Sequence, residues 1–323
     1  MSRFLAGRLL QTILVLLLLS AATYGLLGLM PGDPVDLMAG ADPDITPADI
    51  ARLKVLYGLD RPIWERYLTW LSSALQGDFG YSRLYARPVL DIVADRLPTT
   101  ILLIGLSLAV ALVVALPAAI VAARNPGGLM DRAINLLCFA GVSVPPFWLA
   151  LLLIILFAVT LGWLPAGGMS SPSGDDGLLD RARHLILPVI TLSAATVAAY
   201  TRHLRSALIE VLGEDYIRTA RSKGVPERRV MTRHALRNAL LPVVTLIGLD
   251  LGSLVSGALI TETMFSQLGM GKTIYDAVMG NDYNLALVGL LTAAAATLIG
   301  NLGADIAYAK LDPRIVYRAE PGA

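Results

Sequence analysis

The sequence predicts an all-α protein that crosses a membrane several times, with about six transmembrane helices. Three observations lead to this prediction. Of the 323 residues, 55% are hydrophobic and only 16% are charged, whereas about a quarter of a soluble domain is charged. The charges gather in a few stretches between long apolar runs. Lysine and arginine are concentrated in those stretches that alternate helices would place on one side of the membrane.

The first apolar run covers residues 9–30 and follows Arg3 and Arg8. It is longer than the core of a signal peptide and no small-x-small cleavage site closes it, so we expect a retained helix. Residues 31–96 are too polar and too many for a plain loop, and we expect a folded extracytoplasmic insertion of mostly short helices. One of these is predicted to begin at Thr46-Pro47-Ala48-Asp49, a typical helix N-terminus.

Five further apolar runs complete the predicted transmembrane set. They cover residues 97–123, 133–161, 185–200, 240–260 and 285–309. Prolines within or at the starts of these runs are expected to kink the helices, while neighbouring groups satisfy the carbonyls that proline leaves free. These prolines are Pro117, Pro145, Pro146 and Pro188. The predicted organisation is a tail with the first helix (1–30), the insertion (31–96), a core of five helices (97–310) and a C-terminal tail (311–323).

The distribution of positive charge predicts the orientation. One side would receive the N-terminus, the turn at 124–132, the basic loop at 202–240 and the C-terminal tail. The outer loops at 162–184 and 261–284 hold only Arg181, Arg183 and Lys272 as lysines or arginines. Because cytoplasmic loops carry the excess of these residues, both termini are predicted to be cytoplasmic.

The basic loop at 202–240 has a helical pattern instead of a disordered one. Gly224 stands where a helix would end in the left-handed conformation, and Pro226 prevents the helix from continuing. The pattern predicts a short helix, a sharp turn and a second helix, which together could dock in a groove on a partner. The alternative is a basic loop that lies on anionic lipid headgroups.

The residue order of this loop resembles the coupling loop of ABC importer permeases. In those proteins a Glu-Ala-Ala triplet and three further residues precede a glycine, and here Arg218-Thr219-Ala220 and Gly224 take these positions. The departures at Arg218, Thr219 and Arg237 resemble the dipeptide, oligopeptide and nickel branch. Further motifs of that branch occur in order along nearly the whole chain: Pro31-Gly32-Asp33-Pro34, Tyr57-Gly58-Leu59-Asp60-Arg61-Pro62, Gly77-Asp78-Phe79-Gly80, Ser143-Val144-Pro145-Pro146-Phe147-Trp148, Glu262-Thr263-Met264-Phe265 and Leu311-Asp312-Pro313-Arg314. Gln267-Leu268 stands where Trp-Pro is common.

The resemblance implies a type I ABC importer permease, most like the first (B-type) dipeptide permease, in a bacterial plasma membrane. It implies import of di- or oligopeptides delivered by an extracytoplasmic binding protein, with a second homologous permease and two cytoplasmic ATPases that bind the ATP and magnesium. Separately, the near-zero net charge, with 26 lysines and arginines against 25 acidic residues, gives no strongly basic surface that would suggest a nucleic-acid partner. The residues expected to couple this chain to an ATPase are Glu214, Asp215, Tyr216, Arg218, Thr219, Ala220, Lys223, Gly224 and Arg237.

No catalytic, metal or cofactor site is expected in the chain itself. The single cysteine, Cys138, and three scattered histidines do not have metal-ligand spacing. The stretch from Gly269 to Thr273 resembles the end of a phosphate-binding loop, but Ser266 stands where that motif needs glycine and a membrane helix is predicted where it needs a strand.

Asp250, Ser253 and Ser256 in the fifth apolar run are candidates for lining a translocation pathway, because an intramembrane carboxylate is costly. The alternative for Asp250 is a structural hydrogen bond between helices that pack closely at glycines. Glu262, at the outer end of the same run, is expected to be solvated. Competing functions are a self-sufficient secondary transporter, a membrane enzyme, or a nickel or glutathione ABC importer permease.

Overall fold

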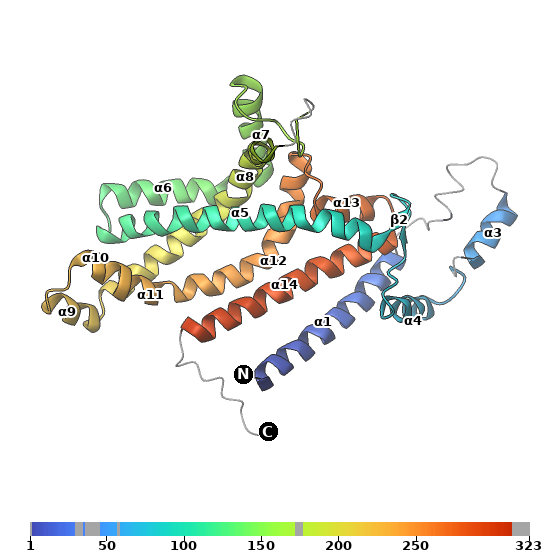
Figure 1. Ribbon diagram of the computed structural model, residues 1–323, viewed down its shortest axis with the longest axis horizontal. Coiled ribbons are helices and arrows are strands. Elements are labelled where there is room, and N and C mark those ends of the chain that lie inside the picture. Colours follow the sequence, from blue (N-terminus) through green and yellow to red (C-terminus); the bar gives the residue numbers. More distant parts are fainter. Residues whose placement is uncertain (1, 30–34, 36–45, 57–58, 172–176, 312–323) are drawn as a thin grey trace. The chain divides into compact units, whose positions relative to one another are not determined.

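The computed structural model describes residues 2–29, 35, 46–56, 59–171 and 177–311. Within these ranges, the side chains of residues 2–6, 56, 245, 249–257, 304–305 and 307–311 are not described. Figure 1 shows a chain built almost wholly of helices, so the prediction of an all-α membrane protein is confirmed. The described chain divides into two units, Met1–Thr99 with Leu268–Ala296 and Thr100–Gln267 with Thr297–Ala323. Helices α5 (Val89–Arg124) and α14 (Tyr283–Leu311) contribute residues to both units.

The first unit contains the predicted insertion. Its other elements are α1 (Ser2–Gly28), α3 (Pro47–Leu56), α4 (Ile63–Ala74), β1 (Tyr81–Ser82), β2 (Arg87–Pro88) and α13 (Met270–Met279). The predicted helix start at Thr46 is confirmed by a reciprocal cap: the Asp49 amide donates to Thr46 Oγ1 at 3.3 Å, and the Thr46 amide donates to Asp49 Oδ2 at 3.1 Å. The two-residue antiparallel hairpin β1–β2 was not predicted, because strands this short carry no periodicity.

Aromatic rings attach α4 to the end of α1. The rings of Tyr24 and Tyr67 lie 5.6 Å apart in an edge-on arrangement, and Trp70 lies against both. The Ser20 hydroxyl is 2.8 Å from the Tyr67 hydroxyl, a second link between the two helices. A buried apolar cluster that includes Leu27 continues from these contacts into α5, α13 and the start of α14.

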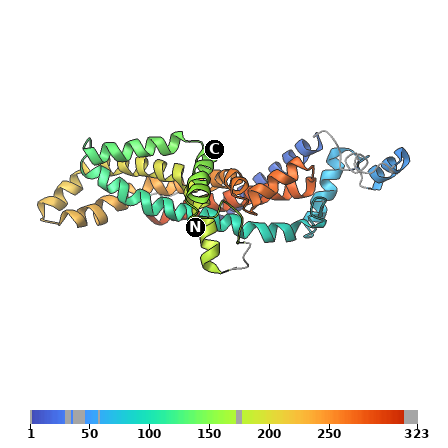
Figure 2. The same cartoon turned by 90° about the horizontal axis from the view of Figure 1, so that it is seen from above.

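The second unit holds the remaining helices. They are α6 (Leu129–Ser143), α7 (Pro146–Leu153), the π-helical η1 (Ile154–Thr160), α8 (Leu178–Leu212), α9 (Asp215–Ser222), α10 (Glu227–Arg229), the π-helical η2 (Val230–Ala235), α11 (Leu236–Ala239) and α12 (Leu241–Met264). Helix α6 packs along α8 in both views (Figures 1 and 2), and α12 packs against α7 and α8. Helices α5, α8 and α12 contribute to the buried apolar clusters of this unit.

Four described helices are long and apolar enough to cross a membrane: Gly7–Gly28, Val89–Arg124, Leu178–Leu212 and Tyr283–Gly303. The predicted run at 185–200 thus forms part of a single 35-residue helix. Helix α12 has 24 residues at the position of the fifth predicted run, but many of its side chains are outside the described set. The total of six spans stays a prediction.

One predicted helix is wrong in form. The run at 133–161 was expected to be a single kinked helix, but it consists of two helical segments, Leu129–Ser143 and Pro146–Thr160, bent by 102°. Val144 and Pro145 between them have extended backbones, because proline favours an extended conformation at the residue before it and cannot donate to a helical carbonyl. Consecutive prolines therefore break this span instead of bending it.

Candidate functional site

Residues 215–239 comprise two short helical stretches joined by the predicted turn, and we call them the helix–turn–helix segment. Gly224 adopts a left-handed φ of +73°. The Val225 amide donates to the Ala220 carbonyl at 3.2 Å, and the Gly224 amide donates to the Arg221 carbonyl at 2.9 Å. These two bonds form a Schellman motif, which satisfies the last carbonyls of α9. Pro226 then precedes α10, so the predicted helix end at Gly224 and the predicted second helical stretch after Pro226 are both confirmed.

The preceding helix reaches further than the sequence suggested. The basic loop was predicted to begin at residue 202, but α8 continues without interruption to Leu212. Gly213 ends α8, and Glu214 is the extended residue that starts α9. The helix–turn–helix segment is therefore attached directly to the end of a transmembrane helix, with only a short connection between them.

A buried apolar face anchors the helix–turn–helix segment. Ile217 on α9 and Val230 on η2 are both fully buried. They belong to one cluster with Tyr200, Leu204 and Leu208 of α8, which also includes alanines of α5. Burying side chains of this size stabilises the packing by about 1.5–3 kcal/mol each. The segment is therefore expected to move with α5 and α8 as one body.

The opposite face of the segment is charged and exposed. Of the predicted coupling residues, the structure exposes Glu214, Asp215, Tyr216, Arg218, Thr219, Lys223, Gly224 and Arg237. Ala220 differs from them, because it is 8% exposed and belongs to the buried cluster. The predicted residues thus divide into an exposed surface and one packing position.

Two side-chain contacts connect the helical stretches across the turn. Arg221 donates to Glu227 at 2.7 Å, and Asn238 Nδ2 donates to the Tyr216 hydroxyl at 2.7 Å. The Arg221 guanidinium holds the pKa of the Glu227 carboxyl below its ordinary value. Both charged partners are largely solvent-exposed, so the pair contributes less than about 1 kcal/mol and mainly fixes the geometry of the turn.

A buried ion pair joins α6 to the part of α8 that was predicted to belong to the cytoplasmic loop. Asp131, whose side chain is 3% exposed, accepts from Arg205 Nε at 2.5 Å and from a terminal guanidinium nitrogen at 2.6 Å. The Gly127 amide and the Asn135 side chain also donate to Asp131. This carboxylate is therefore fully coordinated, and it fixes the 124–132 turn against the helix that leads to the helix–turn–helix segment.

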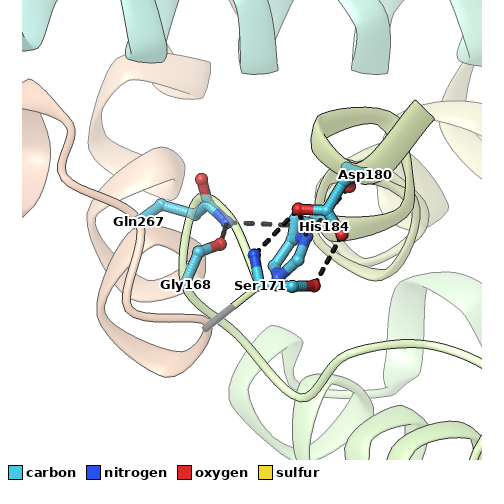
Figure 3. Close-up of polar contacts among 5 residues, drawn as sticks. All are labelled: Gly168, Ser171, Asp180, His184 and Gln267. Atoms are coloured by element: carbon cyan, nitrogen blue, oxygen red, sulfur yellow. Dashed lines mark hydrogen bonds and ion pairs between the residues drawn. The ribbon is translucent and has the colours of Figure 1, made fainter. Parts of the chain in front are cut away.

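A second polar cluster lies at the start of α8 (Figure 3). Ser171 donates to the Asp180 carboxylate twice, from its amide at 2.8 Å and from its hydroxyl at 2.6 Å. Gln267 Nε2 donates to the Gly168 carbonyl at 2.7 Å and to the His184 carbonyl at 3.4 Å. We call these residues, Gly168, Ser171, Asp180, His184 and Gln267, the polar clasp.

The polar clasp explains how α8 accommodates its internal proline. Pro188 has no N–H, so the His184 carbonyl four residues earlier lacks its usual helical donor. Gln267 supplies that donor from the segment that follows α12. The expectation that neighbouring groups would satisfy carbonyls freed by proline is therefore confirmed at Pro188.

The same clasp brings two backbones close together. The Gly168 amide donates to the Phe265 carbonyl at 2.9 Å. A Cβ at Gly167 would lie 2.6 Å from the Phe265 carbonyl oxygen, so only glycine fits there without a shift of the backbone. Ser266 adopts a left-handed φ of +51° and turns Gln267 toward the clasp.

The predicted pathway residues lie on α12. Asp250, Ser253 and Ser256 recur at intervals of three along its backbone, which places them near one face of the helix, but their side chains are outside the described set. Glu262 was expected to be solvated, and this is wrong: it is fully buried and accepts from Thr100 Oγ1 at 2.6 Å.

The other marked residues have ordinary structural contacts. Lys272 and Thr273 lie in the first turn of α13, where Lys272 pairs with Asp276 at 2.5 Å and Thr273 donates to the Gly269 carbonyl. No group of three metal-ligating side chains occurs within the described residues.

Comparison with known proteins identifies the family. A family model described as the binding-protein-dependent transport system inner membrane component matches residues 115–317, and a model of the N-terminal part of such components matches residues 1–104. The chain belongs to the binding-protein-dependent transport permeases. A permease of this family is a multi-pass membrane protein that is not itself catalytic, and its family implies a binding protein and ATPase partners.

Curated relatives match the permease from end to end. It is 40% identical to the oligopeptide transport system permease protein AppB of Bacillus subtilis over 318 residues, 98% of this chain and 100% of the relative. It is 38% identical to the di/tripeptide transport system permease protein DppB of Pseudomonas aeruginosa, over 98% of this chain and 99% of the relative. The glutathione transport system permease protein GsiC of Escherichia coli is 37% identical over 98% of this chain and 100% of the relative.

Sequence reasoning missed the polar contacts that hold the helices of the permease together. Asp131 with Arg205, Glu262 with Thr100 and the polar clasp all join residues far apart in the chain. One signal was available: Gln267 stands where Trp-Pro is common in the family. A polar residue at such a position needs partners, and the clasp provides them.

Proposed function

We propose that the helix–turn–helix segment of this permease is the docking element for a cytoplasmic ATPase, and that it passes the movement of the ATPase to the transmembrane helices. The observation that carries this proposal is the division of the segment into a buried face and an exposed face. The buried face is continuous with α5 and α8, and eight of the nine predicted coupling residues, all except Ala220, are exposed. A docking element needs both properties, since a flexible loop would absorb the movement.

The proposed complex contains a second homologous permease, two ATPases and an extracytoplasmic binding protein, in a bacterial inner membrane with both termini of this chain cytoplasmic. The ATPases would bind ATP with magnesium. We propose di- or oligopeptides as the substrates, and the names of the relatives AppB and DppB support this choice. Glutathione, a small peptide in chemical terms, is the second candidate because GsiC is nearly as similar.

The ATPase-docking proposal is tested by purifying the tagged permease from its native membrane in mild detergent and identifying the proteins that accompany it. Lys223→Glu reverses a charge on the exposed face of the turn, and Thr219→Arg adds bulk on the exposed face of α9. Arg132→Glu is the matched control, because Arg132 is an exposed arginine on the predicted cytoplasmic side but outside the segment. Ala220 is unsuitable as a docking probe, since its substitution would disturb the buried cluster.

We expect the wild-type chain and the Arg132→Glu variant to retain a second permease and ATPases, and the Lys223→Glu, Thr219→Arg double variant to lose at least nine-tenths of the bound ATPase. The thermal midpoint of the purified double variant should stay close to that of wild type. Full ATPase retention by this variant would refute docking through the segment. A homo-oligomer without ATPases in the wild type would favour a self-sufficient transporter.

The substrate proposal needs a separate measurement. Uptake of a labelled dipeptide by cells that express the complete system is competed with oligopeptides, glutathione or nickel ions. Peptides should compete at the lowest concentrations. Competition by glutathione alone, or by nickel alone, would replace the peptide assignment and leave the docking proposal untouched.

A further inference from the structure

A cavity of about 630 Å³ lies in the unit formed by residues 1–99 and 268–296. Tyr24, Leu27 and Gly28 from the last turns of α1 line it, together with Tyr283 and Asn284 from the first turn of α14. These residues are the ends of two candidate spans, Gly7–Gly28 and Tyr283–Gly303. The cavity is therefore placed at a membrane–water boundary, whichever way the chain is oriented.

The lining of this cavity carries an excess of positive charge. Arg61, Arg66 and Arg83 line it, and Asp282 is its one acidic residue within the described part of the chain. Asp282 is already occupied, because it accepts from the Ser82 hydroxyl and from the Leu84 amide. Arg83 donates to the Gly280 carbonyl. None of the ion pairs found among the described residues involves Arg61 or Arg66.

Two lining residues also hold unused donors. Among the described residues, neither Trp70 Nε1 nor Arg83 Nε has a hydrogen-bond acceptor, although both atoms are buried. Buried donors are paired in the great majority of cases, so such groups indicate a missing acceptor. Arginine donors match the oxygens of phosphate in geometry and charge. The polar part of the cavity is therefore suited to an anion with several acceptor oxygens.

The apolar part of the surroundings points to an amphipathic ligand. Tyr24 and Trp70 contribute aromatic surface, and such rings gather at the level of lipid headgroups. Below the cavity, α1 presents apolar side chains outward: from Gly7 to Gly28 only Ser20, Thr23 and Leu27 are buried. A molecule whose charged end enters the cavity could therefore lay its hydrocarbon part along α1.

We propose that this cavity binds the headgroup of an anionic phospholipid, with its phosphate held by Arg61 and Arg66 and its acyl chains lying along α1. The excess of arginine favours a headgroup with net negative charge over a zwitterionic one, whose cationic end would meet the arginines. A free anion would satisfy the arginines but would make no use of the exposed apolar surface of α1. The bound lipid would fasten the insertion, through α4, to the membrane surface.

The test uses the purified complete complex and native mass spectrometry, which counts bound lipids. Phosphatidylglycerol, phosphatidylcholine and inorganic phosphate are titrated separately. The test variant is Arg61→Gln with Arg66→Gln, which removes two charges without touching the Arg83–Gly280 contact. Arg87→Gln is the matched control, because Arg87 is an exposed arginine of the same unit that pairs with Asp95 and does not line the cavity.

Wild type and Arg87→Gln should bind phosphatidylglycerol at least tenfold more tightly than phosphatidylcholine. The double variant should lose this preference, while the number of other subunits in its complex stays unchanged. Equal binding of the two lipids by wild type, or undiminished preference in the double variant, would overturn the proposal. Displacement of phosphatidylglycerol by an equal concentration of inorganic phosphate would also overturn it, because the site would then recognise the free anion. If the double variant does not assemble, Arg61→Gln alone should lower the preference severalfold, and an unchanged preference would again overturn the proposal.

Discussion

The two ends of α8 are held in different ways. At its start, the polar clasp joins three chain segments through hydrogen bonds from the Ser171 amide and hydroxyl and from the Gln267 side chain. Toward its other end, alanines and larger apolar side chains pack against it. Two charged contacts to α6 are added there: the buried ion pair between Asp131 and Arg205, and the Arg202 guanidinium 4.8 Å above the Phe139 ring.

The difference follows from what each end must do in the proposed mechanism. A clasp of directional hydrogen bonds fixes one geometry and tolerates little sliding. Packed alanines allow α5 to approach α8 closely, so that these two helices and the helix–turn–helix segment can shift together as one body. We therefore expect the start of α8 to act as the fixed point and its end, with the helix–turn–helix segment, to act as the moving part.

The largest expected effect is at the buried ion pair. Arg205→Ala should destabilise the permease by about 3–5 kcal/mol, because it leaves the buried Asp131 carboxylate without its cation. The measurement is the midpoint of unfolding in mild detergent. Arg205→Ala combined with Asp131→Ala should cost clearly less than the sum of the two single changes, and strict additivity would show that the pair is not coupled.

The next effect is at the clasp. Gln267→Leu should cost about 1–3 kcal/mol, since it removes the donor from the Gly168 and His184 carbonyls. In a Pro188→Ala background the helix regains its own N–H for His184, so the cost of Gln267→Leu should fall. Gln76→Leu, at an exposed glutamine on the surface, is the control and should change stability by less than about 0.5 kcal/mol. An equal cost of Gln267→Leu in both backgrounds would contradict the link to Pro188.

A smaller effect is expected at the turn of the moving part. Gly224→Ala should destabilise the helix–turn–helix segment by about 1–2 kcal/mol, because the left-handed conformation crowds a Cβ against its own backbone. There is open space around the glycine, so the cost is conformational and not a clash. Gly105→Ala, on the exposed side of helix α5, should be neutral or stabilising by up to about 1 kcal/mol. Hydrogen exchange of the α9 amides measures the first change, and hydrogen exchange of the α5 amides measures the second.

The smallest effect concerns the exposed pair across the turn. Arg221 lowers the pKa of Glu227 from its ordinary 4.5, so the contribution of this pair is present above that value and is lost as the pH falls through the lowered pKa. Solvent exposure limits the change to less than about 1 kcal/mol. The measurement compares the protection of the α9 amides from hydrogen exchange at neutral and at acidic pH. Glu227→Gln should remove the difference in protection between the two pH values. A pH dependence that survives this substitution would belong to other groups.

Local patterns were enough to predict the turn of the helix–turn–helix segment. The polar clasp, in contrast, depends on contacts that no local pattern contains. Gly224 can adopt the left-handed conformation without a Cβ clash, and Pro226 lacks the N–H that a continuing helix would need, so the turn between them follows from sequence. The partners of Gln267 lie far along the chain, and no periodicity specifies them. Pro145 and Pro146 predicted a disturbance of the third helix but not its size, because a bend of 102° depends on what packs on either side.

The uninterrupted length of α8 has a consequence for how such a chain can vary. Its 35 residues extend about 50 Å, well beyond a hydrocarbon core of about 30 Å. Each residue inserted into this helix would rotate everything beyond it by about 100° and advance it by about 1.5 Å. A single insertion between Pro188 and Leu208 would thus turn the helix–turn–helix segment away from the direction set by the clasp. Length and rotational phase are tied together along this helix, and insertions should be tolerated only outside it.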